Sequence, residues 1–183
     1  MLALISKFIL KSLGWSIINE VELPNKAIII AAPHTSNWDF LIARCYTYSV
    51  KLKANYLIKE ELFYPIIGWL IKINGGIPVY RNNKNNLVDQ VVDRFNREES
   101  LILAMTPEGT RKKVDKWKTG FYYIALNAHV PVILFKMDFK TKEIGFLNLI
   151  NLTGDFQNDM QFIENQYKNQ QGKISANYNP KIF

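Results

Sequence analysis

Short apolar runs alternate with longer helix-like segments along most of this 183-residue chain, and this alternation constrains the fold more than any other feature. Several runs are apolar on both faces, as buried parallel strands are. The predicted strands are 27–32, 55–58, 77–80, 101–105, 130–135 and 144–149. The predicted helices are 38–50, 61–73, 84–98, 118–128 and 156–170, and a polar tail follows. The pattern predicts an α/β fold with a mostly parallel central sheet flanked by helices.

The chain is expected to form one domain over residues 1–183, because this length can bury a substantial core. Its first 14 residues predict an amphipathic helix ahead of the sheet, with Lys7 and Lys11 four residues apart on one face. The broad apolar face holds Leu2, Ile5, Phe8, Ile9 and Leu13. Such a helix fits a membrane interface, or equally a first helix packed on its own core. The stretch carries neither a signal-peptide pattern nor the ~20 apolar residues that a spanning helix needs.

The charge balance favours anionic partners without choosing among them. Lysine and arginine exceed aspartate and glutamate by 23 to 16, a formal net charge of +7. Nucleic acid, phosphorylated metabolites and an anionic bilayer would all be attracted. Cys45 is alone, so an intramolecular disulfide is excluded, which suits a reducing cytoplasm, and we expect this thiol in the core.

Chemistry is expected at the carboxyl ends of the strands, where open α/β sheets place their sites. After the first predicted strand the sequence PHTSNWDF supplies His34 and Asp39. Thr35 and Ser36 are good N-cap residues, which puts Asp39 in or near the first helical turn, within reach of His34. A carboxylate on one ring nitrogen leaves the other to act as a base on a substrate hydroxyl. The spacing equally allows Asp39 to cap the helix while His34 makes a structural hydrogen bond.

Two further loops carry basic residues. The stretch NGGIPVYR brings Arg81 to the end of a strand, where a guanidinium suits a phosphate. The stretch TPEGTRKKVDKWKTG places EGTR at 108–111, followed by basic residues up to Lys118. Such a run is commonly a solvated loop, but in a cleft it would concentrate an anionic ligand. Trp117 within it is expected in the core.

In this order, the three loops resemble the glycerolipid acyltransferases, the family of bacterial 1-acyl-glycerol-3-phosphate and lysophospholipid acyltransferases. HTSNWD matches the family's H-x4-D motif, GGIPVYR is similar to its second block, and EGTR is its third. VPVILF resembles a fourth, proline-centred strand, and WKTG matches a later element of the family. The resemblance covers residues 27–135, the motif-bearing core.

The resemblance implies an O-acyltransferase that moves a fatty acyl group from acyl-CoA or acyl carrier protein to a lysophospholipid hydroxyl, with 1-acyl-glycerol-3-phosphate as the first candidate. His34 would be the general base, Asp39 would orient it, and no acyl-enzyme would form. The implied substrate-binding residues are Arg81, Glu108, Gly109, Thr110, Arg111 and Lys118. No metal or cofactor is expected. The family also implies peripheral or monotopic contact with the cytoplasmic face of the cell membrane, through the N-terminal helix.

Other functions stay open at this point. The nearest alternative is the same chemistry on another lysolipid or alcohol. A second alternative is a thioesterase, which uses water in place of the alcohol. A basic module that binds membranes or nucleic acid without catalysis is a third, but the chain has no helix-turn-helix, zinc-finger or RNP pattern, and no nucleic-acid partner is expected. His129, the other histidine, is expected partly buried or at a helix end, in a structural role.

Overall fold

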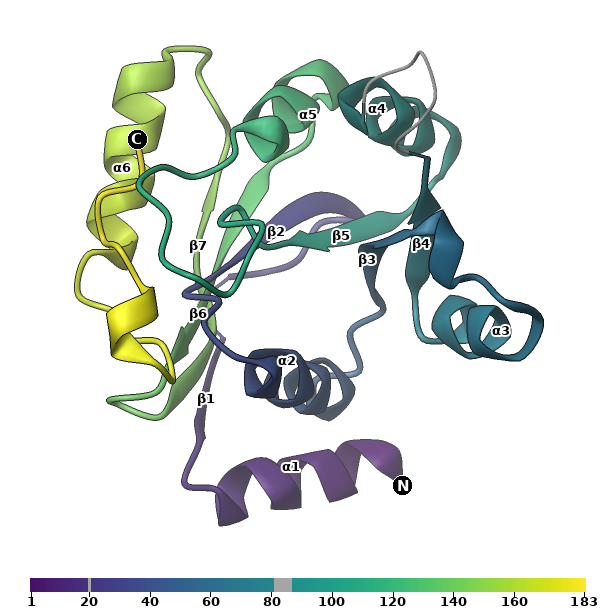
Figure 1. The fold of residues 1–183 in the computed structure, drawn as a ribbon, viewed down its shortest axis with the longest axis vertical. Helices are drawn as coiled ribbons and strands as arrows, with labels where there is room; N and C mark the ends of the chain where they lie inside the picture. Colours follow the sequence, from purple (N-terminus) through teal and green to yellow (C-terminus); the bar gives the residue numbers. More distant parts are fainter. Residues whose placement is uncertain (20, 81–86) are drawn as a thin grey trace.

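The computed structural model describes residues 1–19, 21–80 and 87–183. The strands of these ranges form one sheet, in the order β1-β7-β6-β2-β5-β3-β4, through the middle of the molecule (Figure 1). They are β1 Ser16–Asn19, β2 Lys26–Ala32, β3 Ala54–Lys59, β4 Gly76–Val79, β5 Leu101–Met105, β6 Val132–Asp138 and β7 Glu143–Ile150. The strands from β6 to β4 run parallel, β7 is antiparallel to β6, and β1 is parallel to β7.

Helices cover both faces of this sheet. They are α1 Leu2–Ser12, α2 Asn37–Ser49, α3 Pro65–Ile73, α4 Leu87–Arg97, α5 Gly120–Ala128 and α6 Phe156–Tyr167, with 3-10 turns at Glu60–Leu62 and Ser175–Asn177. α4, α5 and α6 pack on one face, α2 and then α1 lie on the other, and α3 stands beyond the β4 edge (Figure 1). The predicted class, a mostly parallel α/β sheet preceded by an N-terminal helix, is confirmed.

β2 shows why the central runs are apolar at every position. Ile28 and Ile30 belong to the core cluster that α4, α5 and α6 cover, whereas Ala27 and Ile29 belong to the cluster that α1 and α2 cover. Because successive side chains of a strand point to opposite faces, a strand covered on both sides needs apolar residues throughout. β2 is also the middle strand of the sheet, so its carboxyl end emerges at the centre of the molecule.

The structure adds one strand and shortens one helix relative to the sequence prediction. β1 was missed, because this four-residue strand carries little pattern of its own and pairs with β7, which is distant in sequence. The helix predicted over 61–73 is interrupted: a 3-10 turn comes first, and α3 begins at Pro65, whose fixed φ suits the first helical position. Of the helix predicted over 84–98, the structure describes Leu87–Arg97 as α4, and 84–86 lie outside the described residues.

The segment after α6 is packed rather than a free polar tail. Tyr178 and Ile182 are buried, and the Tyr178 hydroxyl donates to the carbonyl of Tyr167 at 3.1 Å. The backbone N–H of Trp117 donates to the Ile182 carbonyl at 2.8 Å. The segment predicted as a polar tail is therefore polar in composition but anchored to the core by two well-spaced apolar side chains.

Two residues singled out in the sequence lie close to where they were expected. Trp117 is buried against Tyr167, with ring centroids 5.4 Å apart, so its predicted place in the core is confirmed. Cys45 is only half-buried and packs against the cluster of α1 and α2, and burial raises the pKa of its thiol. None of the helices in the described ranges has the length and apolar character needed to cross a bilayer.

Candidate active site

The first and third polar loops meet at one edge of the sheet, although His34 and Glu108 are 74 residues apart. β2 and β5 are parallel neighbours in which Ile30 pairs with Met105, so the chain leaves both strands on the same side. The loop that carries His34 and the loop that carries Glu108 therefore start next to each other. This is the edge at which parallel sheets place their sites.

His34 is oriented by the same aspartate that closes the N-terminus of α2. Ser36 is the N-cap residue, and the backbone N–H groups of Thr35 and Ser36 donate to Asp39 Oδ2 at 2.6 and 2.8 Å. The Nδ1 atom of His34 lies 3.2 Å from that oxygen. Asp39 is 2% exposed, whereas 22% of the His34 side chain is accessible. Asp39 thus both caps the helix and contacts one nitrogen of the imidazole, an arrangement that leaves Nε2 as the ring nitrogen not held by Asp39.

Glu108 holds the backbone of the histidine from the other side. Its Oε2 accepts the N–H of His34 at 2.7 Å, and the residue is 4% exposed. The pKa of Glu108 is raised to about 8, chiefly by burial; the charge of Asp39 adds to this shift, and the His34 N–H bond opposes it. At neutral pH the Glu108 carboxyl is therefore mainly protonated. Its bond to the His34 backbone joins the two loops.

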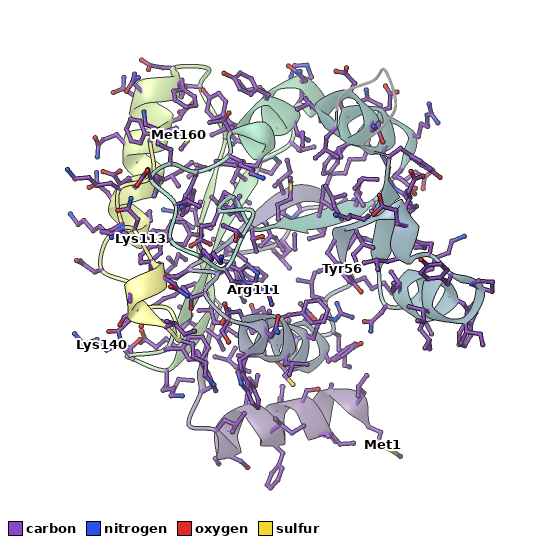
Figure 2. The ribbon with its side chains drawn as sticks, viewed as in Figure 1. Met1, Tyr56, Arg111, Lys113, Lys140 and Met160 are labelled. Carbon is purple, nitrogen blue, oxygen red and sulfur yellow. The ribbon has the colours of Figure 1, made fainter. Side chains whose placement is uncertain are left out.

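A pocket of about 410 Å³ opens beside His34. Its polar lining is His34, Asn37, Asp39, Arg44, Thr47, Asn55, Thr106 and Arg111, and its apolar lining includes Ala31, Phe40, Ala43, Leu57, Met105 and Met137. Figure 2 shows Arg111 near the centre of the molecule, above α2, with Tyr56 to its right on the far side of this pocket. A mostly apolar pocket with a histidine and a guanidinium at its mouth suits a hydrocarbon chain with a polar, anionic head.

The predicted binding residues of the third loop take different places. Arg111 lines the pocket, and its guanidinium donates to the side-chain oxygen of Asn37. Gly109 has a φ of +65°, and a Cβ there would lie 2.8 Å from the Lys118 side chain, so only glycine fits without strain. Thr110 is exposed and its Oγ1 accepts the N–H of Lys112 at 3.3 Å. Gly109, Thr110 and Lys118 lie on the same loop as Arg111 but outside the pocket lining.

The remaining residues predicted for the site lie in different parts of the molecule. Glu108, expected at the phosphate, has its carboxyl buried against His34 and does not line the pocket. Arg81 lies outside the described residues. His129 is exposed at the C-cap of α5 with a φ of 53°, in agreement with the expected place at a helix end. In the described ranges no three His, Cys, Asp or Glu side chains come together as metal ligands.

Sequence reasoning missed the pocket wall that α2 contributes. Asn37, Phe40, Arg44 and Thr47 all line the pocket. These positions follow each other at intervals of three or four residues, so they share one face of the helix. That periodicity was present in the sequence, but only the position of α2 under the sheet edge shows that this face is the one turned to His34.

The sequence of the chain matches a known protein family over most of its length. The family model described as Acyltransferase matches residues 16–136. The chain is 31% identical over 142 residues to the "Probable 1-acyl-sn-glycerol-3-phosphate acyltransferase" of Mycoplasma pneumoniae. That alignment covers 71% of this chain and 52% of the relative, so the chain spans about half the length of that protein.

Among solved structures, the fold is similar to that of the 1-acyl-sn-glycerophosphate (LPA) acyltransferase PlsC from Thermotoga maritima, with a TM-score of 0.61. The similarity covers 90% of this chain and 74% of that one, at 16% sequence identity, a level that bears on the fold alone.

The fold and the site define the class: an α/β protein with a histidine–aspartate pair at the carboxyl edge of a parallel sheet. Within that class, the chain belongs to the acyltransferase family. The family match spans the region from β1 to β6, which holds His34, Asp39 and EGTR. The family inferred from the sequence motifs is confirmed.

Proposed function

We propose that this chain is an O-acyltransferase that moves a fatty acyl group from acyl-CoA or acyl carrier protein to a hydroxyl of a lysophospholipid. The observation that carries the proposal is the pairing of His34 Nδ1 with the buried Asp39, at the mouth of a largely apolar pocket that also presents Arg111. Family membership supports acyl transfer. The name of the Mycoplasma pneumoniae relative supports 1-acyl-glycerol-3-phosphate as the first acceptor to test.

In the proposed reaction, Nε2 of His34 takes the proton of the acceptor hydroxyl as its oxygen attacks the thioester carbonyl. Asp39 stabilises the imidazolium that forms. The tetrahedral intermediate collapses with loss of the thiolate, which receives the same proton from His34, so the ester and the free thiol leave without an acyl-enzyme. Lys118 is the candidate donor for the oxyanion, because the backbone N–H groups of His34, Thr35 and Ser36 already donate to Glu108 and Asp39.

The acceptor is proposed to lie with its acyl chain along the apolar part of the pocket and its phosphate at the mouth. Arg111 lines that mouth, and a guanidinium binds phosphate with paired N–H donors. Gly109, Thr110 and Lys118 would complete the polar rim, and Arg81 stays a candidate from the sequence. For Glu108, the buried bond to the His34 backbone supports a positioning role in place of the expected phosphate contact.

Contact with the cytoplasmic leaflet is proposed through α1, as a peripheral or monotopic mode. Leu4 and Phe8 are 73% and 71% exposed, whereas the residues of α1 that are buried are Ser6 and Leu10. Lys7 and Lys11 add two cations to this exposed apolar helix, which is the pattern of an interfacial helix on an anionic membrane.

The test is an acyl-CoA transfer assay over a panel of lysolipids, with His34→Ala as the variant. We expect the rate to fall by about 10²–10⁴-fold, the usual contribution of general-base catalysis, with unchanged circular dichroism. Substantial transfer by a folded His34→Ala protein would refute the proposed role. Fatty acid release that the acceptor does not suppress would identify a thioesterase instead, and the acceptor panel separates 1-acyl-glycerol-3-phosphate from other lysolipids.

A further inference from the structure

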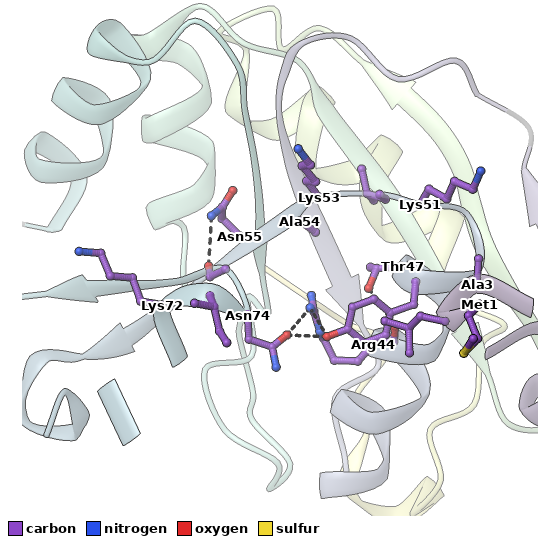
Figure 3. A pocket seen from close by; sticks show the side chains of 15 residues that line it. Met1, Ala3, Arg44, Thr47, Lys51, Lys53, Ala54, Asn55, Lys72 and Asn74 are labelled. Atoms are coloured by element: carbon purple, nitrogen blue, oxygen red, sulfur yellow. Dashed lines mark hydrogen bonds between the residues drawn. The ribbon is translucent and has the colours of Figure 1, made fainter. Parts of the chain in front are cut away.

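A second hollow of about 650 Å³ adjoins the candidate active site (Figure 3). It lies between the first residues of α1, the C-terminal half of α2, the start of β3 and the end of α3. Its charged lining residues are Arg44, Lys51, Lys53 and Lys72, and none of its lining residues is acidic. Four cations around one groove without a carboxylate give it a positive potential that would attract an anion.

The cations of this groove differ in how they are held. Lys51, Lys53 and Lys72 are exposed, and none of them takes part in the ion pairs found within the described ranges. Arg44 is fixed: its guanidinium donates to the Tyr48 hydroxyl at 3.0 Å and to the side-chain oxygen of Asn74. The groove therefore combines one ordered guanidinium with three exposed lysines, whose side chains extend in different directions in Figure 3.

α3 extends one wall of the groove with an exposed apolar surface. The buried residue of α3 is Gly68, which packs so closely on the Phe63 backbone that a Cβ there would come within 2.7 Å of it. The outward residues of α3 are Ile66 at 77%, Ile67 at 54%, Trp69 at 62%, Leu70 at 50% and Ile73 at 64% exposure. An exposed apolar helix that carries a tryptophan marks a contact surface, and tryptophan favours the membrane interface.

The other wall carries a similar surface. The start of α1 borders the groove, and along α1 the residues Leu2, Leu4, Ile5 and Phe8 are about half or more exposed. Ile73, at the end of α3, faces the same groove as Met1 and Leu2. A basic groove thus lies between two helices whose apolar side chains are exposed. At a bilayer surface, the cations would meet the phosphate groups while the apolar side chains reach the hydrocarbon beneath them.

We propose that this groove binds the phosphate of an anionic phospholipid of the bilayer, while α1 and α3 place their apolar side chains among the acyl chains on either side. The proposal rests on the membrane contact proposed above and is independent of acyl transfer. A soluble anion would use the cations but not the two apolar helices, whereas a lipid phosphate uses both. The site orients the molecule, because Arg44, Thr47, Ala54 and Asn55 also line the pocket of His34 and so keep that pocket beside the bound lipid.

The test compares two triple variants of equal charge change. K51Q/K53Q/K72Q removes the rim of the groove, and K140Q/K168Q/K181Q removes three exposed lysines elsewhere on the surface. On vesicles of phosphatidylcholine with phosphatidylglycerol, we expect the groove variant to bind about tenfold or more weakly than the wild type, since each lysine near an anionic surface contributes about fivefold. The control variant should lose much less, and Ile66→Ser with Trp69→Ser should weaken binding to neutral and anionic vesicles alike.

A titration with dihexanoyl phosphatidylglycerol, below its micelle concentration, separates a built site from diffuse attraction. The wild type and the control variant should saturate, and the groove variant and dihexanoyl phosphatidylcholine should not. Equal losses in both triple variants would overturn the proposal. So would unchanged vesicle binding with a raised KM for acyl-CoA, which would assign the groove to the donor. Acyl transfer to a soluble short-chain acceptor reports on the proposed function separately, because none of the three lysines lines the His34 pocket.

Discussion

Replacing Glu108 by Gln should change how the stability of the protein depends on pH. Burial raises the pKa of this carboxyl from 4.5 to about 8. Between these two values the folded protein keeps a proton that the unfolded chain has lost, so the free energy of unfolding falls as the pH rises through this window. At about 1.4 kcal/mol for each unit of pKa, the full loss from below pH 4.5 to above pH 8 is on the order of 5 kcal/mol.

Glutamine has the same shape, stays neutral and still accepts the His34 N–H. At pH 5, where most of Glu108 is protonated in the folded state, we expect Glu108→Gln to match the wild type within about 1 kcal/mol. At pH 9 the variant should be the more stable protein, by up to about 5 kcal/mol. Urea unfolding followed by circular dichroism at both pH values measures the two differences.

Glu108→Ala separates the titration from the hydrogen bond. This variant leaves the His34 N–H without its acceptor, so it should be destabilised by about 1–3 kcal/mol at pH 5, where the wild-type carboxyl is neutral. A difference between Glu108→Gln and the wild type that is the same at pH 5 and pH 9 would refute the reasoning, because it would mean that Glu108 does not titrate in this window.

Two further substitutions test the supports of the site. Gly109→Ala puts a side chain at a φ of +65°, so thermal unfolding should show a loss of about 1–2 kcal/mol, and because the new Cβ displaces the end of the Lys118 side chain, acyl transfer should slow; an unchanged melting temperature would contradict this. Tyr167→Phe removes a buried hydroxyl that donates to the carbonyls of Ile30 at 2.8 Å and Phe135 at 3.2 Å. Urea unfolding should show a loss of about 1–3 kcal/mol in the free energy of unfolding. An unchanged free energy of unfolding would mean that these carbonyls need no donor.

Much of the fold was predictable because its signals are local. Runs such as KAIIIAA are apolar on both faces only in a strand covered on both sides, and Ser36 with Asp39 forms a capping box that starts α2 where the sequence predicts it. β1 and the packed C-terminal segment were not predictable in the same way. Their stability comes from partners distant in the chain: β7 for β1, and the core around Tyr167 for Tyr178.

The candidate site likewise has one part that is predictable from local sequence and one part that is not. The H-x4-D spacing places His34 and Asp39 within one turn of a helix start, so their contact is a local consequence of the sequence. The role of Glu108 is not local. Its carboxyl reaches His34 only because β2 and β5 are parallel neighbours, and its raised pKa exists only because the packed loops exclude water.

By itself, then, the sequence determined most of the strands and helices, the histidine–aspartate pair and the family, because each depends on residues close together in the chain or on motifs in a set order. The tertiary structure alone decided which face of α2 lines the pocket, that Glu108 is buried beneath His34, and that four cations gather between α1 and α3. The physical reason is that burial and electrostatic environment are properties of neighbours in space, and those neighbours are brought together only when the sheet forms.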